Sequence, residues 1–323
     1  MTPEVPDSPW SDLDRPPLNG AALRRALVRP GTLWTRLDVV PSTGSTNSDL
    51  VARAGSLPAG TVLVAERQTA ARGRLDRRWS APARSGLFFS VLLRPEVPEA
   101  RWTWLPLLAG VATATTLSRT AGVDTALKWP NDLLVTQSGG GTGTVPHGAE
   151  ANGEARVAGG SEHVTERKIG GILAERAAAD DTGREAVVIG VGLNVTLRAD
   201  ELPVPTAGSL ALAGAPLTDR APLLRAVLRS LAQWYEDWTA ADGDPLGSGL
   251  QETYAAGCST LGRTVRAELP GGRSLTGEAV ALDGDGRLVL ATADGVRHPV
   301  GAGDIVHLRP ADAGPDRRSA AGE

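Results

Sequence analysis

The sequence has little cysteine and no long apolar run. Its one cysteine, Cys258, excludes an internal disulfide framework and fits a reducing cytoplasm. No stretch approaches the roughly 20 consecutive apolar residues that a membrane-spanning helix needs. Residues 1–10 are acidic and rich in proline and have no apolar core, which excludes an ordinary secretory signal peptide. We therefore expect a cytoplasmic protein without a membrane segment.

The sequence also lacks an excess of basic residues and a spacing of histidines that would bind a metal. The 323 residues include 33 basic and 37 acidic side chains, which gives a formal net charge of −4. This balance lacks the domain-wide basic excess that is typical of nucleic-acid-binding proteins. The histidines show no metal-ligand spacing, so a zinc site is not expected. They are His147, His163, His298 and His307.

Lysine is the scarcest of the charged residues. Among the 33 basic side chains only Lys128 and Lys168 are lysines. One interpretation is a general drift toward arginine that left two lysines by chance. The other is that both positions need a compact ammonium group, which sits among oxyanions where a planar guanidinium does not. The motifs around the two lysines favour the second interpretation.

The order of expected elements predicts an α+β fold, in which helices flank a mixed β-sheet. Hydrophobic periodicity and capping residues define the helices, and short apolar runs define the strands. The expected helices cover residues 21–28, 47–54, about 101–120, 219–239 and 249–256. The expected strands cover residues 35–40, 61–65, 87–93, 125–129, 133–135, 168–174 and 186–195.

The pattern changes after residue 256 to short strands separated by glycine turns, which is typical of a small β-barrel. These strands are expected at 264–268, 275–282, 288–291, 296–300 and 305–308. Residues 136–166 show no periodicity, so we interpret them as a flexible insertion in a hairpin. The predicted organisation is a disordered leader (1–19), a catalytic domain (20–256), a C-terminal domain (257–311) and a disordered tail (312–323).

The densest polar segment is residues 66–79, which directly follows an apolar strand. Its arginines can bind phosphate through two hydrogen bonds each, and Gly73 lets the backbone approach a ligand closely. Trp79 at its end offers a ring on which a base can stack. Neither lysine follows the glycine spacing of a phosphate-binding Walker loop. The segment predicts a flexible cover over an anion, although such loops are also often simply solvated.

Lys128-Trp129-Pro130-Asn131-Asp132 places an ammonium, an amide and a carboxylate at the end of a strand. Asn131 can read a ribose or base edge, and Asp132 can hold Mg²⁺ or accept a proton. An ordinary Asn-Asp turn explains the same residues equally well on spacing alone.

Lys168 opens an apolar strand that contains Gly170-Gly171. Adjacent glycines inside a strand indicate that another group packs against bare backbone. Because a charged residue begins the same strand, a ligand is the favoured candidate for that group.

Taken together, the motifs resemble those of biotin protein ligases. The resemblance covers about residues 33–308, and it implies a class II aminoacyl-tRNA-synthetase-like catalytic domain followed by an SH3-like barrel. The five motifs occur in the family's order and are Gly44–Asn47, Gln68–Trp79, Lys128–Asp132, Lys168–Ile172 and Gly190–Asn194.

The resemblance implies an enzyme, a biotin–[biotin carboxyl carrier protein] ligase. The carboxylate of biotin attacks the α-phosphate of ATP, with Mg²⁺, to give biotinyl-5′-adenylate and pyrophosphate. A lysine of a biotin carboxyl carrier domain, part of an acetyl-CoA or acyl-CoA carboxylase, then takes the biotinyl group. The resemblance leaves a monomer and a homodimer open and implies neither a nucleic-acid nor a membrane partner.

The family's functional residues map onto this sequence position by position. Those implied for catalysis are Arg72, Arg74, Asp132 and Lys168, and Asp132 is also the implied Mg²⁺ ligand. Those implied for biotin are Ser45, Thr46, Asn47, Gln68, Arg72, Gly73, Arg74, Lys168, Gly170 and Gly171. Those implied for ATP and the adenylate are Arg72, Arg74, Arg77, Trp79, Lys128, Asn131, Asp132, Lys168 and Asn194. The covering loop departs from the family pattern at Ala71, Leu75 and Asp76.

Two other functions remain open from the sequence. A lipoate or octanoate transferase that uses covalent catalysis needs a cysteine nucleophile, but Cys258 lies at the junction with the barrel. A biotin-responsive DNA-binding repressor carries an N-terminal winged helix. About 30 residues precede the first expected strand, which is too few for such a domain. The expectation is therefore a ligase without a repressor domain.

Overall fold

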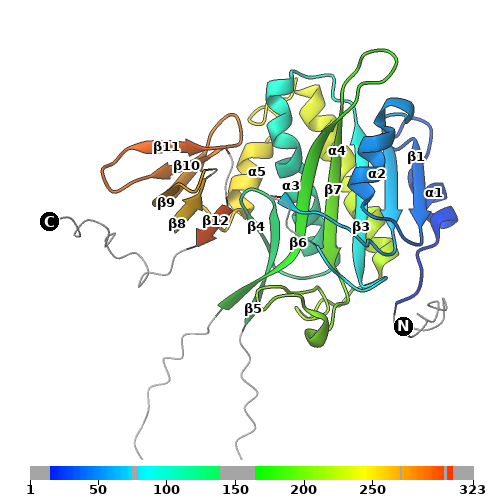
Figure 1. The fold of residues 1–323 in the computed structure, drawn as a ribbon, viewed down its shortest axis with the longest axis horizontal. Helices are drawn as coiled ribbons and strands as arrows, with labels where there is room; N and C mark the ends of the chain where they lie inside the picture. The colour runs from blue at the N-terminus through cyan, green and yellow to red at the C-terminus, as the bar shows by residue number, and fades with distance from the viewer. Residues whose placement is uncertain (1–14, 75–78, 139–163, 270, 302–303, 308–323) are drawn as a thin grey trace, which may run out of the picture.

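The computed structural model describes residues 15–74, 79–138, 164–269, 271–301 and 304–307. These residues form a large mixed sheet with helices on both faces and a smaller antiparallel sheet beside it (Figure 1). Within the described residues, no helix combines the length and the apolarity that crossing a bilayer requires.

The large sheet has seven strands in the order β1-β2-β3-β7-β6-β5-β4. The pair β1–β2 is parallel, and the other neighbours are antiparallel. Every residue of β2 and β3 is buried, as expected for continuous apolar runs covered on both faces. The strands are β1 Arg36–Val40, β2 Thr61–Ala65, β3 Gly86–Leu93, β4 Thr125–Lys128, β5 Asp132–Ser138, β6 Val164–Ala177 and β7 Ala186–Asn194.

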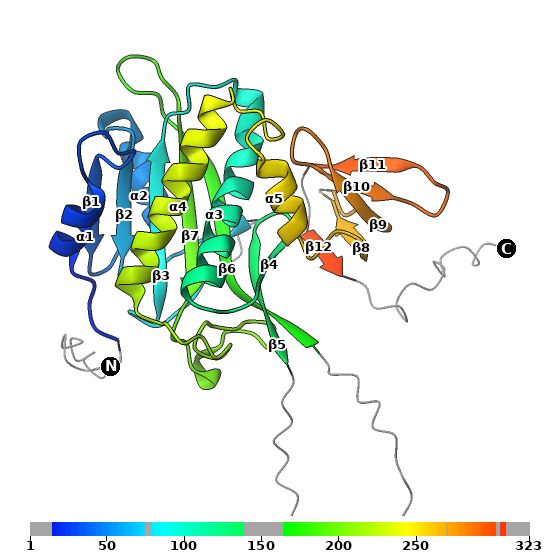
Figure 2. The same ribbon diagram turned by 180° about the vertical axis from the view of Figure 1, so that it is seen from behind.

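Helices cover the two faces of this sheet unequally. Helix α2 (Thr46–Arg53) packs on one face, and α3 (Leu105–Thr120) and α4 (Arg220–Ala240) pack on the other (Figures 1 and 2). Helix α1 (Gly20–Leu27) lies beside β1, and α5 (Leu250–Gly257) lies beside β4. Short 3₁₀ helices occupy Ala54–Ser56, Glu99–Trp104 and Ala199–Glu201.

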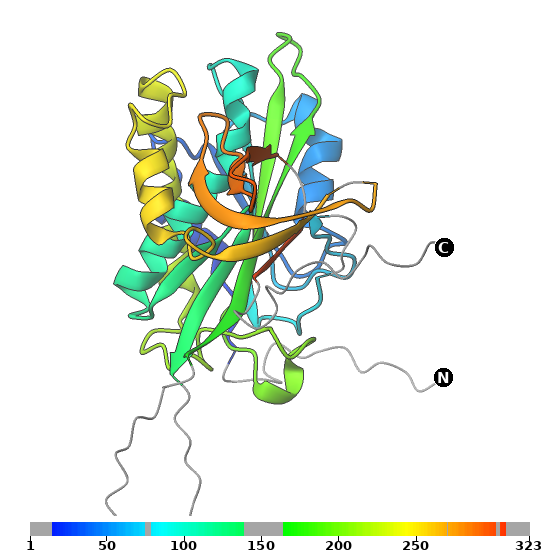
Figure 3. The same cartoon turned by 90° about the vertical axis from the view of Figure 1, so that its left-hand side faces the viewer.

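The smaller sheet has the strand order β11-β10-β9-β8-β12 and faces the viewer in Figure 3. Its strands are β8 Thr264–Glu268, β9 Ser274–Leu282, β10 Leu288–Ala291, β11 Arg297–Val300 and β12 Asp304–His307. Two buried tryptophans of the large-sheet domain join the smaller sheet to it. Trp104 Nε1 donates to Gly284 O at 2.8 Å, and Trp129 Nε1 donates to Gly286 O at 2.9 Å.

The expected helices and strands are confirmed in number and order within the described residues, and the largest differences in extent lie at the start of α3 and in β5 and β6. The helix expected from about residue 101 begins as a 3₁₀ helix, and its α-helical part starts at Leu105, directly before Pro106. Because proline lacks an N–H, it suits the first turn of an α-helix. Residues 136–138 and 164–166, expected to be part of the insertion, extend β5 and β6. Residues 139–163 lie outside the described residues.

The expectation of a disordered leader is wrong for residues 15–19. Arg15 is 4% exposed and donates to both Glu201 carboxylate oxygens and to Thr196. The Arg15 hydrogen bonds lower the pKa of Glu201 below its usual value. Because a buried guanidinium needs a partner, this segment is fixed on the end of β7. Residues 1–14 and the tail from residue 308 lie outside the described residues.

Candidate active site

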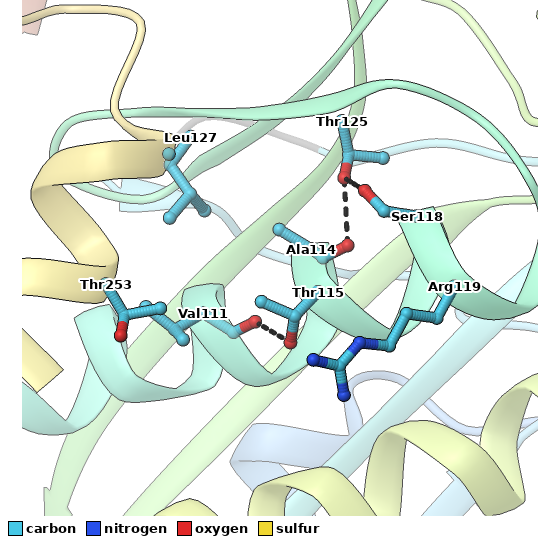
Figure 4. Close-up of a pocket in the computed structure, with 9 residues that line it drawn as sticks. Val111, Ala114, Thr115, Ser118, Arg119, Thr125, Leu127 and Thr253 are labelled. Atoms are coloured by element: carbon cyan, nitrogen blue, oxygen red, sulfur yellow. Dashed lines mark hydrogen bonds between the residues drawn. The ribbon is translucent and has the colours of Figure 1, made fainter. Parts of the chain in front are cut away.

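Two cavities are candidates for a functional site. The smaller, of about 200 Å³, lies between α3, β4 and α5 and contains none of the residues implied by the motifs (Figure 4). Several of its hydroxyls already bond to neighbouring groups: Thr115 Oγ1 donates to Val111 O, and Ser118 shares a hydrogen bond with Thr125. The larger, of about 1510 Å³, is lined by both domains and contains almost all of the implied residues.

A β-bulge directs Lys168 into the larger cavity. Along β6, Leu133 of β5 pairs with Gly170 and Leu134 pairs with Lys168, so the register skips Ile169. Regular alternation would place Lys168 and Gly170 on the same face of the sheet. The extra residue moves Lys168 onto the face of Gly171 instead. A Cβ built on Gly171 would lie 3.7 Å from Lys168 Nζ, which confirms that the two share this face.

The Lys168 ammonium lies at the centre of the site. It donates to Asp132 Oδ1 at 2.5 Å and lies 5.9 Å from the centre of the Trp79 ring. The two side chains are 35% and 21% exposed, so the pair remains accessible from the cavity. The structure thus brings the ammonium of one lysine motif into contact with the carboxylate of the other. It does so across the β5–β6 ladder.

Glycines of β7 and β6 make a flat wall opposite Trp79. A Cβ added at Gly192 would lie 3.3 Å from the Trp79 indole, and one added at Gly171 would lie 3.5 Å from it. Gly190, Gly192 and Asn194 alternate along β7 and line the same cavity. Only glycine leaves room for a flat ring against this part of the sheet.

Gly170 is not among the residues that line the cavity, and the implied biotin contact at Gly170 stays a prediction. Its missing side chain points away from the cavity, where a Cβ would lie 2.8 Å from Leu133 Cδ1 and 2.9 Å from Gly192 O. Gly170 therefore serves close packing in the core. Arg77, implied for ATP binding, lies outside the described residues.

A small polar pocket lies at the N-terminus of α2. Ser45 caps this helix by accepting a hydrogen bond from Ser48 N, and Thr46 N donates to Gln68 Oε1 at 2.8 Å. Ser45, Thr46 and Gln68 line the cavity, and the two hydroxyl residues are almost fully buried. Their hydroxyl and amide groups can recognise a small polar head group.

Asn47 and Arg72 are held by a residue that the motif analysis left without a role. Glu175 Oε2 accepts from Asn47 Nδ2 at 2.9 Å, and Glu175 Oε1 accepts from Arg72 Nη2 at 3.1 Å. Glu175 follows Gly171 and Leu173 on the cavity face of β6. The amide donor of Asn47, a residue implied to bind biotin, is thus already hydrogen-bonded within the protein. Arg72 remains 47% exposed.

Two buried polar atoms near the glycine wall have no hydrogen-bond partner among the described residues. They are Asn194 Oδ1, an acceptor, and Trp79 Nε1, a donor. Asn194 Nδ2 donates to Gly208 O at 3.0 Å, which fixes the orientation of its amide. Nearby, Asn131 Nδ2 donates to Ile172 O and braces the turn that carries Asp132. Unpaired buried polar atoms are costly, so this wall is built for a polar ligand.

Parts of the cavity wall were not predicted. Residues 203–207 contribute a rim that is joined to Lys168 by hydrogen bonds from Lys168 N to Thr206 O and from Gly208 N to Lys168 O. The small domain contributes Arg263, Glu268, Ile305 and Val306. Arg263 also donates to both carboxylate oxygens of Glu166, at 2.6 and 2.9 Å, and so ties the small domain to β6.

Comparisons with known proteins agree with this architecture. A profile described as "Biotin/lipoate A/B protein ligase family" matches residues 38–194, and one described as "Biotin protein ligase C terminal domain" matches residues 260–308. The chain is 40% identical over 301 residues to the biotin–[acetyl-CoA-carboxylase] ligase of Mycobacterium tuberculosis, which covers 91% of this chain and 97% of that protein.

More distant relatives are also ligases. The chain is 33% identical over 263 residues to the bifunctional ligase/repressor BirA of Bacillus spizizenii, which covers 80% of this chain and 70% of that protein. Among solved structures, the biotin protein ligase from Aquifex aeolicus in complex with biotin and ATP matches with a TM-score of 0.64 and 25% identity. That match covers 85% of this chain and 100% of the other.

The fold and the cavity define a ligase catalytic domain of the biotin and lipoate class, followed in the sequence by an SH3-like domain. The presence of both domains and the 40% identity to a biotin–[acetyl-CoA-carboxylase] ligase distinguish the biotin ligases within this class. This chain belongs to the biotin protein ligase family.

Proposed function

We propose that this protein activates biotin with ATP to biotinyl-5′-adenylate and transfers the biotinyl group to a lysine of a biotin carboxyl carrier domain. The observation that carries the proposal is the Lys168–Asp132 pair. It faces a cavity that has a polar pocket at one end and a flat glycine wall at the other. The two ends suit the ureido ring of biotin and the base of ATP.

In the first step, a carboxylate oxygen of biotin forms a bond to the α-phosphorus as the bond to the pyrophosphate oxygen breaks. Two anions must approach each other, so positive charge at their meeting point lowers the barrier. Lys168 Nζ supplies a compact charge with three donors and can exchange the Asp132 oxygen for substrate oxygens. Arg72, Gly73 and Arg74, which line the same cavity, cover the phosphates and the aliphatic chain of biotin.

Mg²⁺ binds proteins through one or two carboxylates and takes its other ligands from phosphate and water. The described residues contain no cluster of three or more metal-ligating side chains. The cavity therefore fits an ion carried by ATP and held by a single carboxylate. Asp132 would hold it, and the ion would neutralise phosphate charge.

In the second step, the neutral amine of a carrier lysine attacks the acyl carbon, an amide forms and AMP leaves. The attacking nitrogen must lose one proton. Asp132 lines the cavity, is partly exposed and can accept that proton.

The adenylate end of the cavity matches an adenine ring. A flat base would stack against the Trp79 ring, which itself packs over Gly192, and the unpaired Asn194 Oδ1 can accept from an exocyclic amino group. Asn131 and Lys128 also line the cavity and would face the ribose and phosphates.

The partner is a biotin carboxyl carrier domain of the kind that the acetyl-CoA carboxylase ligases modify. A cytoplasmic location, a monomeric or homodimeric state and the absence of nucleic-acid binding stay predictions.

The test of the proposed function is transfer of biotin to a carrier domain. The protein, ATP, Mg²⁺ and biotin should add the mass of one biotinyl group to a purified carrier domain, and a carrier whose target lysine is replaced by arginine should stay unmodified. Lipoylation of a lipoyl domain instead would refute the proposal.

We predict that Arg74→Gly leaves a folded enzyme that retains its adenylate poorly. One charge-assisted hydrogen bond contributes about 1.5–3 kcal/mol, which corresponds to a roughly ten- to hundredfold faster release. The measurement is the off-rate of radiolabelled biotinyl-adenylate from the purified protein. An off-rate equal to that of the wild type would contradict the role of this loop as a cover.

We also predict that Cys258→Ala retains both half-reactions. Cys258 is buried outside the cavity lining, and burial raises the pKa of its thiol, which keeps it from forming the reactive thiolate. Iodoacetamide at pH 8 should therefore label the urea-unfolded protein much faster than the native one. Loss of transfer in Cys258→Ala, with the fold intact, would favour the covalent transferase instead.

A further inference from the structure

Ser90 of β3 links two residues of the polar pocket and belongs to none of the motifs. It is fully buried and does not line the cavity. Its Oγ lies 2.7 Å from Thr46 Oγ1 and 2.5 Å from Asn47 Oδ1. Each hydroxyl has a single proton to donate. The donor in one of these two hydrogen bonds therefore determines the donor in the other.

The direction is set at Asn47. Its Nδ2 faces two acceptors, Leu173 O at 3.1 Å and Glu175 Oε2 at 2.9 Å. A flipped amide would place its oxygen against both of them, so Oδ1 must face Ser90. Oδ1 can only accept, and Ser90 must therefore donate its one proton to Asn47.

Thr46 must then donate to Ser90. If Thr46 gave its proton to Gln68 Oε1, which lies 3.2 Å away, the two hydroxyl oxygens would face each other at 2.7 Å with no proton between them. Gln68 Oε1 already accepts from Thr46 N at 2.8 Å. The Thr46 hydroxyl consequently offers only lone pairs to the cavity, and the carboxamide of Gln68 offers its Nε2 donor.

We propose that Ser90 and Asn47 are positioning residues that fix the Thr46 hydroxyl as an acceptor and so select a ligand with an N–H at this point. The inference rests on the proposed function, since the ureido ring of biotin carries such N–H groups and a dithiolane ring carries none. A ring without the N–H leaves the buried Thr46 oxygen unpaired, which is the situation in which polar sites discriminate most strongly.

The test is a double-mutant cycle on the equilibrium Kd for biotin, measured by calorimetry without ATP. Ser90→Ala frees the Thr46 proton, and we expect the Kd to rise about tenfold. Thr46→Val removes the acceptor itself. In the Thr46→Val background, Ser90→Ala should have no further effect. For Ser90→Ala alone, the kcat of adenylation at saturating biotin and the KM for ATP should stay unchanged, which a general loss of structure would not produce.

Asn47→Ala provides a second variant, because it also releases the Ser90 proton and should reproduce the result if Ser90→Ala folds poorly. Thr113→Val serves as the matched control. The Thr113 hydroxyl is equally buried, donates to Ala109 O within α3 and should leave the Kd unchanged. An unchanged Kd in Ser90→Ala, or additive effects of Ser90→Ala and Thr46→Val, would overturn the inference. Failure of the wild type to bind biotin would instead overturn the proposed function.

Discussion

Replacing Lys168 with arginine is expected to slow adenylate formation by roughly a thousandfold, the upper range for losing one preorganised electrostatic contact. The charge is retained, so the loss comes from shape. The ammonium lies between Asp132 and the bare backbone of Gly171, and a planar guanidinium, whose donors form a fixed fork, cannot replace it as a point charge between the two substrate oxyanions. The measurement is biotin-dependent exchange of labelled pyrophosphate into ATP.

A thermal unfolding curve close to that of the wild type would show that Lys168→Arg folds. Lys168 is 35% exposed, so a longer side chain can be accommodated toward solvent without disrupting the core. Exchange at a near wild-type rate would mean that Lys168 supplies only general charge, and the assignment of its role would fail.

Replacing Trp129 with alanine is expected to lower the free energy of unfolding by about 3–5 kcal/mol, the usual cost of removing a buried large aromatic side chain. Trp129 is 2% exposed and joins the two domains. Its Nε1 donates to Gly286 O, and its backbone N donates to Thr260 Oγ1. Trp129 therefore serves the domain interface as well as lining the cavity with the rest of the Lys128–Asp132 motif.

Trp129→Phe is the matched control, because it keeps most of the ring and removes the N–H. It should lower the free energy of unfolding by only about 1 kcal/mol. Both values come from urea unfolding followed at equilibrium. Equal stability of Trp129→Ala and the wild type would show that the small domain is not fastened through this residue.

The sequence predicted the order of elements well because apolar runs and capping residues act locally. In the structure Ser45 caps α2 and Asp219 caps α4, both directly before the helices they begin. The implied site residues also converge on one cavity, apart from Gly170 and the undescribed Arg77. Motif order was sufficient to find them, because several of the motifs lie on the neighbouring strands β5, β6 and β7.

What could not be predicted depends on pairing between distant strands. The bulge at Ile169, which separates Lys168 from Gly170 and places it on the face of Gly171, is a property of the β5–β6 register and has no signature in β6 alone. Ser90 reads as one small residue in an apolar strand. Its importance follows from Thr46 and Asn47, which reach it from another element. Arg263 enters the cavity wall only because the small domain docks beside β6.

The packing of residues 15–19 was missed for a similar reason. A proline-rich segment with no periodicity indicates disorder, but Arg15 reaches Glu201 and Thr196, which are almost two hundred residues away in the chain. A single buried ion pair of this kind leaves no pattern in the local sequence.

The most direct test of the central claim is one turnover without any carrier domain. The purified protein is mixed with ATP, Mg²⁺ and an equal mixture of biotin and lipoate, and the bound products are identified by mass spectrometry while pyrophosphate is measured. The account predicts biotinyl-5′-adenylate and pyrophosphate in equal amounts, with no lipoyl-adenylate. Lipoyl-adenylate as the main product, or release of ADP and phosphate in place of pyrophosphate, would contradict it.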